Sequence, residues 1–163
     1  MNEIIETNII LKDRLYNGDF GKGSIFGINT YINLKQENNS DKSALGVIKL
    51  ELNFCINEEL GANINSVITN EIPMIISNDN KLKLNNIIKE IENNSDYKYN
   101  ESHYKKDRFD PERLKYKDVI INNEEYEIKS DDNNINELLS IFNYNEYLNI
   151  QMNNYKMIIG KEI

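Results

Sequence analysis

Several residue types that mark specialised protein classes are scarce in this chain. Its 163 residues include one cysteine, one histidine, two prolines and no tryptophan. A single cysteine cannot form a disulfide within the chain, which fits a reducing compartment. One histidine provides neither a histidine pair for a metal nor a recognisable catalytic triad. The sequence therefore excludes a disulfide-stabilised scaffold and gives no motif for histidine-based catalysis.

Long apolar runs are also missing. The longest, residues 72–76, contains Pro73 and is far shorter than the roughly 18–20 residues of a membrane span. Near the N-terminus, Glu3, Glu6 and Asp13 stand where a signal peptide needs positive charge and then apolar residues. We therefore expect a cytoplasmic protein that does not interact with a membrane.

The chain is acidic and rich in asparagine. It carries 19 Lys and Arg against 27 Asp and Glu, a net charge of −8 at pH 7. This balance argues against a wholly basic nucleic-acid coat. The 29 asparagines are interrupted every few positions by Ile, Leu or Tyr, which can supply a core. The length is that of one domain, so we expect a single domain over residues 1–163.

Alternating apolar residues predict an antiparallel sheet in residues 1–57. Residues 3–12 are rich in isoleucine, and residues 25–35 and 44–56 alternate with the period of a half-buried strand. The polar residues 36–43 between the last two segments are typical of a hairpin tip. The apolar face of the segment 44–56 consists of Ile48, Leu50, Leu52 and Phe54.

The middle of the chain, residues 58–94, has helical spacing. Apolar residues from Leu60 to Ile68 fall at i, i+4, i+7 and i+8, and Pro73 would end that helix. A second helix is expected over roughly 80–93, because its apolar residues recur at i, i+3, i+4 and i+7. Asn78 or Asp79 is the expected N-cap of this second helix.

Residues 118–163 predict a hairpin, a helix and a second hairpin. Asn122-Asn123 suits the tight turn of the first hairpin. Acidic residues open a helix over 131–142. A further pair of short apolar segments surrounds Asn153-Asn154 and predicts the second hairpin. The whole pattern indicates an α+β fold, with an antiparallel sheet built from several hairpins and packed with two or three helices.

One segment of the chain is basic. Residues 97–117 carry seven Lys and Arg against four acids, whereas the residues on either side are net acidic. The segment has no clear periodicity, which predicts a long exposed connection. Its side chains suited to phosphates or carboxylates are Tyr97, Tyr99, His103, Tyr104, Lys105, Lys106, Arg108 and Arg113. This segment is the part of the chain suited to direct nucleic-acid contact, although its interleaved acids also fit a solvated loop without a ligand.

Three residues form a candidate enzymatic site. Asp118 begins an apolar strand, and Glu127 and Lys129 share one face of the return strand because side chains alternate. Two carboxylates that hold Mg²⁺ or Mn²⁺, with a lysine beside the attacking water, suit phosphodiester hydrolysis. An alternative is that Glu127 and Lys129 lie on the solvated face of a hairpin.

This segment resembles the D…ExK core of the PD-(D/E)xK nucleases. The expected helices before and after it, 80–93 and 131–142, occur in the order found in that family. The resemblance implies that Asp118 and Glu127 bind the metal and that Lys129 is the catalytic lysine. It covers about a third of the chain, and no proline precedes the aspartate.

Our first hypothesis is nevertheless a non-enzymatic acidic binding protein that engages and inhibits a macromolecular partner. A negative surface steers a domain onto a basic partner such as a nucleic-acid-binding enzyme. Tyrosine adds contact area at a low cost in entropy. The residues expected to contact the partner are Glu124, Glu125, Tyr126, Asp131, Asp132, Tyr144 and Tyr147.

This hypothesis requires no cofactor and no metal. Toxin-immunity proteins and phage-encoded inhibitors of host defence are small acidic proteins of this general character, so we expect a bacterial or phage protein of this kind. The metal-dependent nuclease is the alternative. A third hypothesis is a structural subunit that pairs its edge strands with neighbours in a larger assembly.

Overall fold

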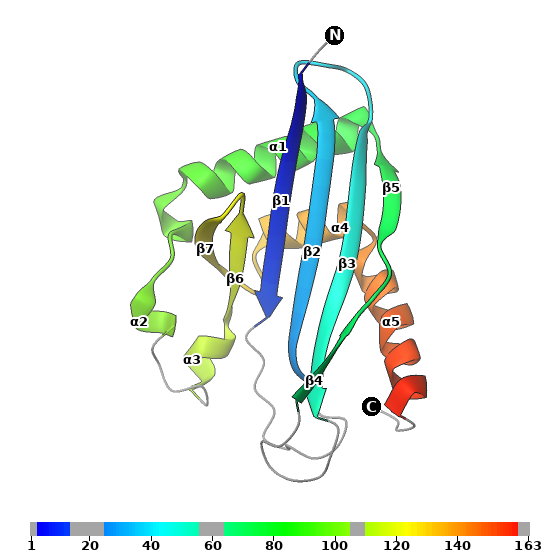
Figure 1. Ribbon diagram of the computed structural model, residues 1–163. Helices are drawn as coiled ribbons and strands as arrows, with labels where there is room; N and C mark the ends of the chain where they lie inside the picture. The colour runs from blue at the N-terminus through cyan, green and yellow to red at the C-terminus, as the bar shows by residue number, and fades with distance from the viewer. Residues whose placement is uncertain (1–2, 14–24, 56–63, 105–109, 160–163) are drawn as a thin grey trace.

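A computed structural model describes residues 3–13, 25–55, 64–104 and 110–159. In this part of the chain, seven strands form one antiparallel sheet in the order β4-β3-β2-β1-β6-β7, and β5 also pairs with β3 (Figure 1). The strands are β1 (Ile4–Asp13), β2 (Ile25–Glu37), β3 (Ala44–Cys55), β4 (Ile64–Ile68), β5 (Ile72–Ile76), β6 (Tyr116–Ile121) and β7 (Glu124–Lys129). The predicted α+β fold is confirmed.

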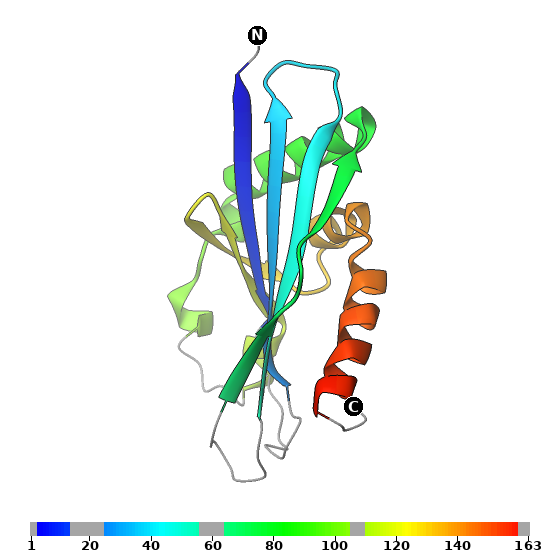
Figure 2. The same cartoon turned by 45° about the vertical axis from the view of Figure 1, so that its right-hand side comes forward.

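Helices cover one face of the sheet. They are α1 (Asn78–Asn93), α4 (Asn133–Ile141) and α5 (Tyr144–Ile159). In Figure 1, α1 and α4 pass behind the sheet, and Figure 2 shows α5 to the right of the strands. The core fills the space between them, where alternate side chains of β1, β2, β3 and β6 meet the apolar stripes of α1 and α4. Three short elements lie near β6 and β7: η1 (Ser95–Tyr97), α2 (Glu101–Tyr104) and α3 (Pro111–Leu114).

The alternation of the first three strands is confirmed. In β3, Ile48, Leu50 and Leu52 are fully buried, and the residues between them are partly exposed. Each strand pairs with its neighbour over about ten residues, and the polar tip joins β2 to β3. The side chain of Phe54, predicted for the same face, lies outside the described residues.

The first predicted hairpin of the C-terminal third is present as β6 and β7. Asn122 and Asn123 form its turn with φ values of 48° and 72°, the left-handed conformations that a two-residue turn requires. The backbone N–H of Asn122 donates to the Asn8 carbonyl over 2.9 Å, and the Asn122 side chain accepts from the Asn8 N–H. These bonds continue the pairing of β6 with β1 up to the turn.

The helix predicted over Leu60 to Ile68 is wrong. The described part of this segment is β4, which pairs with the second half of β3, while β5 pairs with the first half. Thr69 lies between the two strands, where its backbone N–H donates to the Leu50 carbonyl and its Oγ1 accepts from the Leu50 N–H. The free edge of the long strand β3 stabilises an extended chain here, and the β-branched Val67, Ile68 and Thr69 suit it. Leu60 lies outside the described residues.

The hairpin predicted around Asn153-Asn154 is also wrong, because this segment belongs to the helix α5. Tyr144, Tyr147 and Leu148 pack against the core at i, i+3 and i+4, which is helical spacing. Asn143 has a φ of 52° and ends α4 in the left-handed conformation. The two asparagines are exposed on α5 and make no turn.

The helices α1 and α4 begin close to their predicted starts. The N-cap of α1 is Ser77, whose hydroxyl accepts from the Asn80 N–H, rather than the predicted Asn78 or Asp79. Asp132 caps α4 through the Asn134 N–H. The apolar stripe of α1 is buried as predicted: Leu84, Ile87, Ile88 and Ile91.

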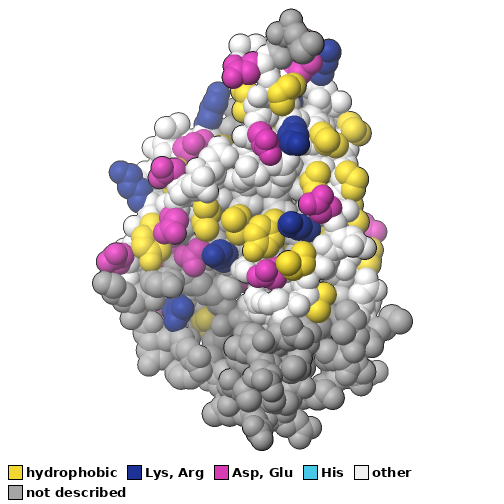
Figure 3. All heavy atoms as spheres, in the orientation of Figure 1, with side chains coloured by type: hydrophobic (Ala, Val, Ile, Leu, Met, Phe, Trp, Pro, Cys, Tyr) yellow, Lys and Arg dark blue, Asp and Glu magenta, His cyan; other side chains and the backbone are white. Residues whose placement is uncertain are grey.

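The opposite face of the sheet is not covered by α1, α4 or α5. Figure 3 shows apolar side chains mixed with lysines and carboxylates over the strands on this face. A shallow hollow of about 470 Å³ lies there, with Ile10, Tyr31 and Val47 among its walls. In the described part of the chain, no helix is long and apolar enough to cross a membrane.

A glycine in β3 tests the packing of the sheet against the helices. A Cβ at Gly46 would lie 2.8 Å from Cε1 of Phe142 and 3.1 Å from Cγ1 of Ile76. Both side chains are almost fully buried, so they cannot move aside without disturbing the core. We expect Gly46→Ala to lower the free energy of unfolding by about 1–3 kcal/mol in urea denaturation.

The matched control is Gly27→Ala in β2. There the nearest neighbour of the new Cβ is Nδ2 of Asn53 at 3.6 Å, an ordinary contact. Its effect on stability should be within about 0.5 kcal/mol. Equal losses of stability in the two variants would contradict this account of the core.

Candidate functional site

The β6–β7 hairpin brings the predicted nuclease residues onto one face. Asp118 on β6 is the direct register partner of Glu127 on β7, so both side chains leave the sheet on the same side. Lys129 lies two residues further along β7, on the same face. Lys12 of β1 is the register partner of Asp118 on its other side. This is the face of the sheet opposite the core.

Glu127 is only 4% exposed although its side chain is a carboxyl group. Its Oε1 is hydrogen-bonded to Nδ1 of His103, which comes from α2. The imidazole ring stacks on Tyr116, with 4.6 Å between ring centres and 16° between ring planes. Histidine and carboxylate thus form a pair that is held in place by an aromatic ring, and α2 is fixed over β7.

Tyr97 and Lys98, at the start of the basic segment, contact β7 and α4 and do not belong to an exposed loop. Lys98 makes an isolated bridge to Tyr126 at the edge of β7. The Tyr97 hydroxyl donates to Asp132 over 3.0 Å and accepts from Asn134. Burial raises the pKa of Tyr97 above its usual value. The prediction of a long connection without regular structure is corrected, because η1, α2 and α3 lie within residues 95–114.

The remaining residues of the predicted basic surface are only partly described. Tyr99 is half-buried beside Asp118 and Lys12. Arg113 lies in α3 and is partly buried. The other predicted contacts, namely the Tyr104 side chain and residues Lys105, Lys106 and Arg108, lie outside the described residues.

Two neighbouring cavities divide the predicted nuclease residues between them. Glu127 and Lys129 line a cavity of about 450 Å³, together with His103 and Tyr116. Asp118 lines a smaller one of about 250 Å³. Among the described residues, no group of three His, Cys, Asp or Glu side chains is placed to hold a metal ion. The hairpin thus places the two carboxylates on the same face of the sheet, but they line two different cavities.

Two residues of the predicted acidic contact surface are buried instead. Tyr144 is 9% exposed and Tyr147 is 7% exposed, and both pack in the core. The Tyr147 hydroxyl donates to the Asn70 carbonyl over 2.8 Å and is hydrogen-bonded to Thr69. These two tyrosines therefore hold α5 against the sheet and are not available to a partner.

The predicted carboxylates differ in their surroundings. Asp132 is partly buried and is used as the cap of α4 and as the acceptor for Tyr97. Glu124, Glu125 and Asp131 are exposed. Glu124 and Glu125 lie at the turn end of β7 and Asp131 just beyond its other end, so they do not form one cluster.

A residue that sequence reasoning missed joins the acidic surface. Burial raises the pKa of the half-buried Tyr126, and the nearby carboxylates of Glu92 and Glu124 raise it further. Glu92 lies in the last turn of α1 and is exposed. Nothing in the sequence relates it to Tyr126, since the two residues are brought together by the packing of α1 on the sheet. We define the acidic surface as Glu92, Glu124 and Tyr126, because Glu125 leaves β7 on the opposite face and lines the cavity of Asp118.

Comparisons with protein-family models, with curated proteins and with solved structures find no match to this chain.

Tyr144 gives a test of the buried tyrosines. Burial raises the pKa of Tyr144 to about 12, the charge of Asp13 acts in the same direction, and a hydrogen bond with Thr30 opposes it. The unfolded chain ionises this tyrosine near pH 10, so between pH 10 and about 12 the unfolded state binds fewer protons than the folded state. Stability should therefore be complete below pH 10 and fall as pH rises through this window, by at most about 1.4 kcal/mol per pH unit.

The measurement is denaturant unfolding at a series of pH values for the wild type and Tyr144→Phe. The difference between the two curves isolates Tyr144 from the other tyrosines and from the lysines. We expect the variant to lose less stability than the wild type above pH 10. Parallel curves would show that Tyr144 ionises like an exposed tyrosine.

Proposed function

We propose that this protein is a non-enzymatic acidic binding protein that engages a basic macromolecule in the cytoplasm and inhibits it. The supporting observation is the acidic surface, where the exposed carboxylates of Glu92 on α1 and Glu124 on β7 lie near the half-buried Tyr126. A tyrosine with two exposed carboxylates nearby offers both contact area and long-range attraction. A basic nucleic-acid-binding enzyme is the kind of partner that such a surface fits.

The mechanism follows from charge. Carboxylates at the edge of the molecule accelerate encounter with a positive groove, and the gain is lost at high salt. Once bound, the acidic surface occupies positions that the partner uses for phosphates. Inhibition then needs no chemistry in the binding protein.

A charge-reversal variant tests the proposal. Bait carrying Glu92→Lys and Glu124→Lys is compared with wild-type bait in affinity purification from the native cell, followed by stopped-flow binding to the purified partner. We expect the variant to associate about tenfold more slowly or worse. The wild-type association rate should fall as salt is raised, and the partner's own activity should fall on addition of the wild type.

The matched control is the double variant Glu71→Lys and Glu137→Lys. Both residues are exposed. Glu71 lies beside Lys49 of β3, and Glu137 lies on α4 near β5. The two substitutions change the net charge by the same amount as the charge-reversal variant. This control should associate like the wild type. An equal loss in both double variants would reduce the effect to net charge, and no loss in either would remove the acidic surface from binding.

A second candidate function is metal-dependent phosphodiester hydrolysis. The observation in its favour is the direct pairing of Asp118 with Glu127, with Lys129 on the same face. A metal bound there would need the Glu127 carboxylate, which is hydrogen-bonded to His103 in this structure. The carboxylates would hold Mg²⁺ or Mn²⁺, and Lys129 would lie near the attacked phosphate.

The nuclease candidate makes its own prediction. Cleavage of DNA or RNA in Mg²⁺ or Mn²⁺ should fall by at least about a hundredfold in Glu127→Gln and in Lys129→Met. Asp118→Asn should abolish metal binding in calorimetry. Lys83→Met, on the exposed side of α1, is the control and should retain activity. Absence of cleavage and of metal binding in the wild type would eliminate this candidate.

A further inference from the structure

Lys81 in the first half of α1 is an unusual residue because it is 2% exposed. Its position follows from the helix, since Lys81, Leu84, Ile88 and Ile91 recur at i, i+3, i+7 and i+10 and share the buried stripe. A lysine is almost never fully buried unless its charge is paired.

The Lys81 ammonium is hydrogen-bonded but has no counter-ion among the described residues. Its Nζ donates to the carbonyls of Ser40 and Lys42 in the turn between β2 and β3. An ammonium has three N–H donors, so one remains without an acceptor in this part of the chain. The nearby carboxylate of Glu37 is paired with Lys42, at 3.5 Å. A buried charge without a partner of opposite sign is strongly unfavourable.

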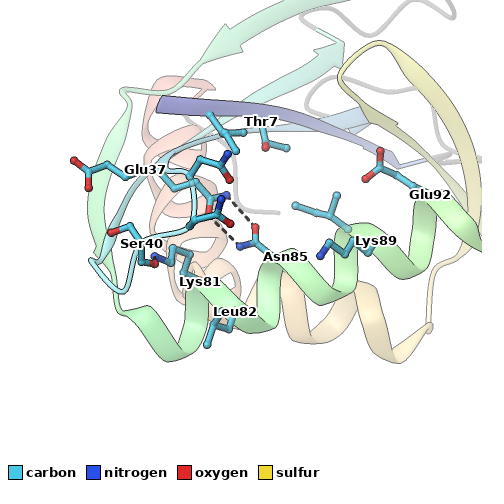
Figure 4. Close-up of a pocket in the computed structure, with 13 residues that line it drawn as sticks. Thr7, Glu37, Ser40, Lys81, Leu82, Asn85, Lys89 and Glu92 are labelled. Atoms are coloured by element: carbon cyan, nitrogen blue, oxygen red, sulfur yellow. Dashed lines mark hydrogen bonds between the residues drawn. The ribbon is translucent and has the colours of Figure 1, made fainter. Parts of the chain in front are cut away.

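A cavity of about 330 Å³ adjoins Lys81, between α1 and the start of β1 and the turn after β2 (Figure 4). One wall is a pair of amides, Gln36 and Asn85, which exchange hydrogen bonds of 2.9 and 3.0 Å. Ile5 and Ile88 provide apolar walls, and Lys89 is a second cation in the lining. The cavity is thus already formed and does not need a side chain to move.

The two carboxylates in the lining do not neutralise Lys81. Figure 4 shows Glu92 at the far end of the cavity, and the Glu37 carboxylate pointing away from Lys81. No ion pair joins either of them to Lys81 within the described ranges. The positive end of the cavity is therefore the end beside Ser40.

We propose that this cavity binds a small molecule or terminal group bearing an oxyanion, a carboxylate or a phosphate, with the Lys81 ammonium as its counter-charge. The third N–H of Lys81 supplies a charge-assisted hydrogen bond to the anion. Two N–H groups of Lys81 bind the turn between β2 and β3. A bound anion would account for the third N–H and for the presence of a charged residue at a buried position beside a cavity. The site is separate from the proposed contact with a basic partner, and its failure leaves that proposal unchanged.

The test is a two-dimensional NMR titration of the full-length protein with acetate, inorganic phosphate and chloride at constant ionic strength. We expect saturable shifts of the amide signals of Ser40 and Asn85 with an oxyanion and none with chloride. The acetate and phosphate series show which oxyanion is preferred. Lys81→Met should weaken binding at least about tenfold, while Lys83→Met, on the exposed side of the same helix, should bind like the wild type.

A second variant covers the case in which Lys81→Met does not fold. Leu82 is 51% exposed on the wall of the cavity, so Leu82→Glu adds a negative charge there without disturbing the core. It should weaken oxyanion binding severalfold, and Ile75→Glu, 73% exposed on β5, should not. Shifts that do not saturate, that chloride reproduces, or that persist unchanged in both cavity variants would overturn the proposal.

Discussion

The central position of β1 is the constraint on which the rest of the structure depends. β1 pairs with β2 on one side and with β6, more than a hundred residues later, on the other. The second pairing is secured at one end by the Asn8–Asn122 hydrogen bonds and at the other by an ion pair between Asp13 and the buried Lys117, at 3.3 Å. Without it the β6–β7 hairpin would have no sheet to join, and a two-stranded hairpin is marginal alone. The approach of Tyr126 and Glu124 to Glu92 of α1, which forms the acidic surface, therefore depends on this one long-range contact.

The local sequence pattern was sufficient to predict those elements whose intrinsic preference is the same as the structure that their neighbours stabilise. The alternation of Ile48, Leu50 and Leu52, the stripe of α1 and the left-handed turn at Asn122 each have one stable solution. The errors lie where a neighbour decides the outcome. Val67 and Ile68 extend along the edge of β3, and the residues after Asn143 form α5, which packs its apolar side chains against the core.

The candidate site was predictable in part for the same reason. Strand alternation and a two-residue turn place Asp118, Glu127 and Lys129 on one face, and this needs only local geometry. The His103–Glu127 hydrogen bond joins two elements whose contact no local pattern encodes. Tyr144 and Tyr147 stand near acidic residues in the sequence, which suggests an exposed position. Both lie on the face of α5 that packs against the core, and they are buried there. The burial of Lys81 could have been predicted, because Lys81 and Leu84 are three residues apart and lie on the same face of α1.

Apart from Asp79 in its first turn, several charges of α1 are placed against the electrostatic preference of the helix. Acidic residues are favourable near a helix N-terminus and basic ones near its C-terminus, by about 0.3–1 kcal/mol each. In α1 the last turn has no basic residue and carries Glu90 and Glu92, while Lys81 and Lys83 lie in the first half. Helix stability therefore does not account for this order. Glu92 at one end supplies a carboxylate to the acidic surface, and Lys81 at the other supplies a cation to the cavity, so the two proposals give these residues a role that the helix itself does not.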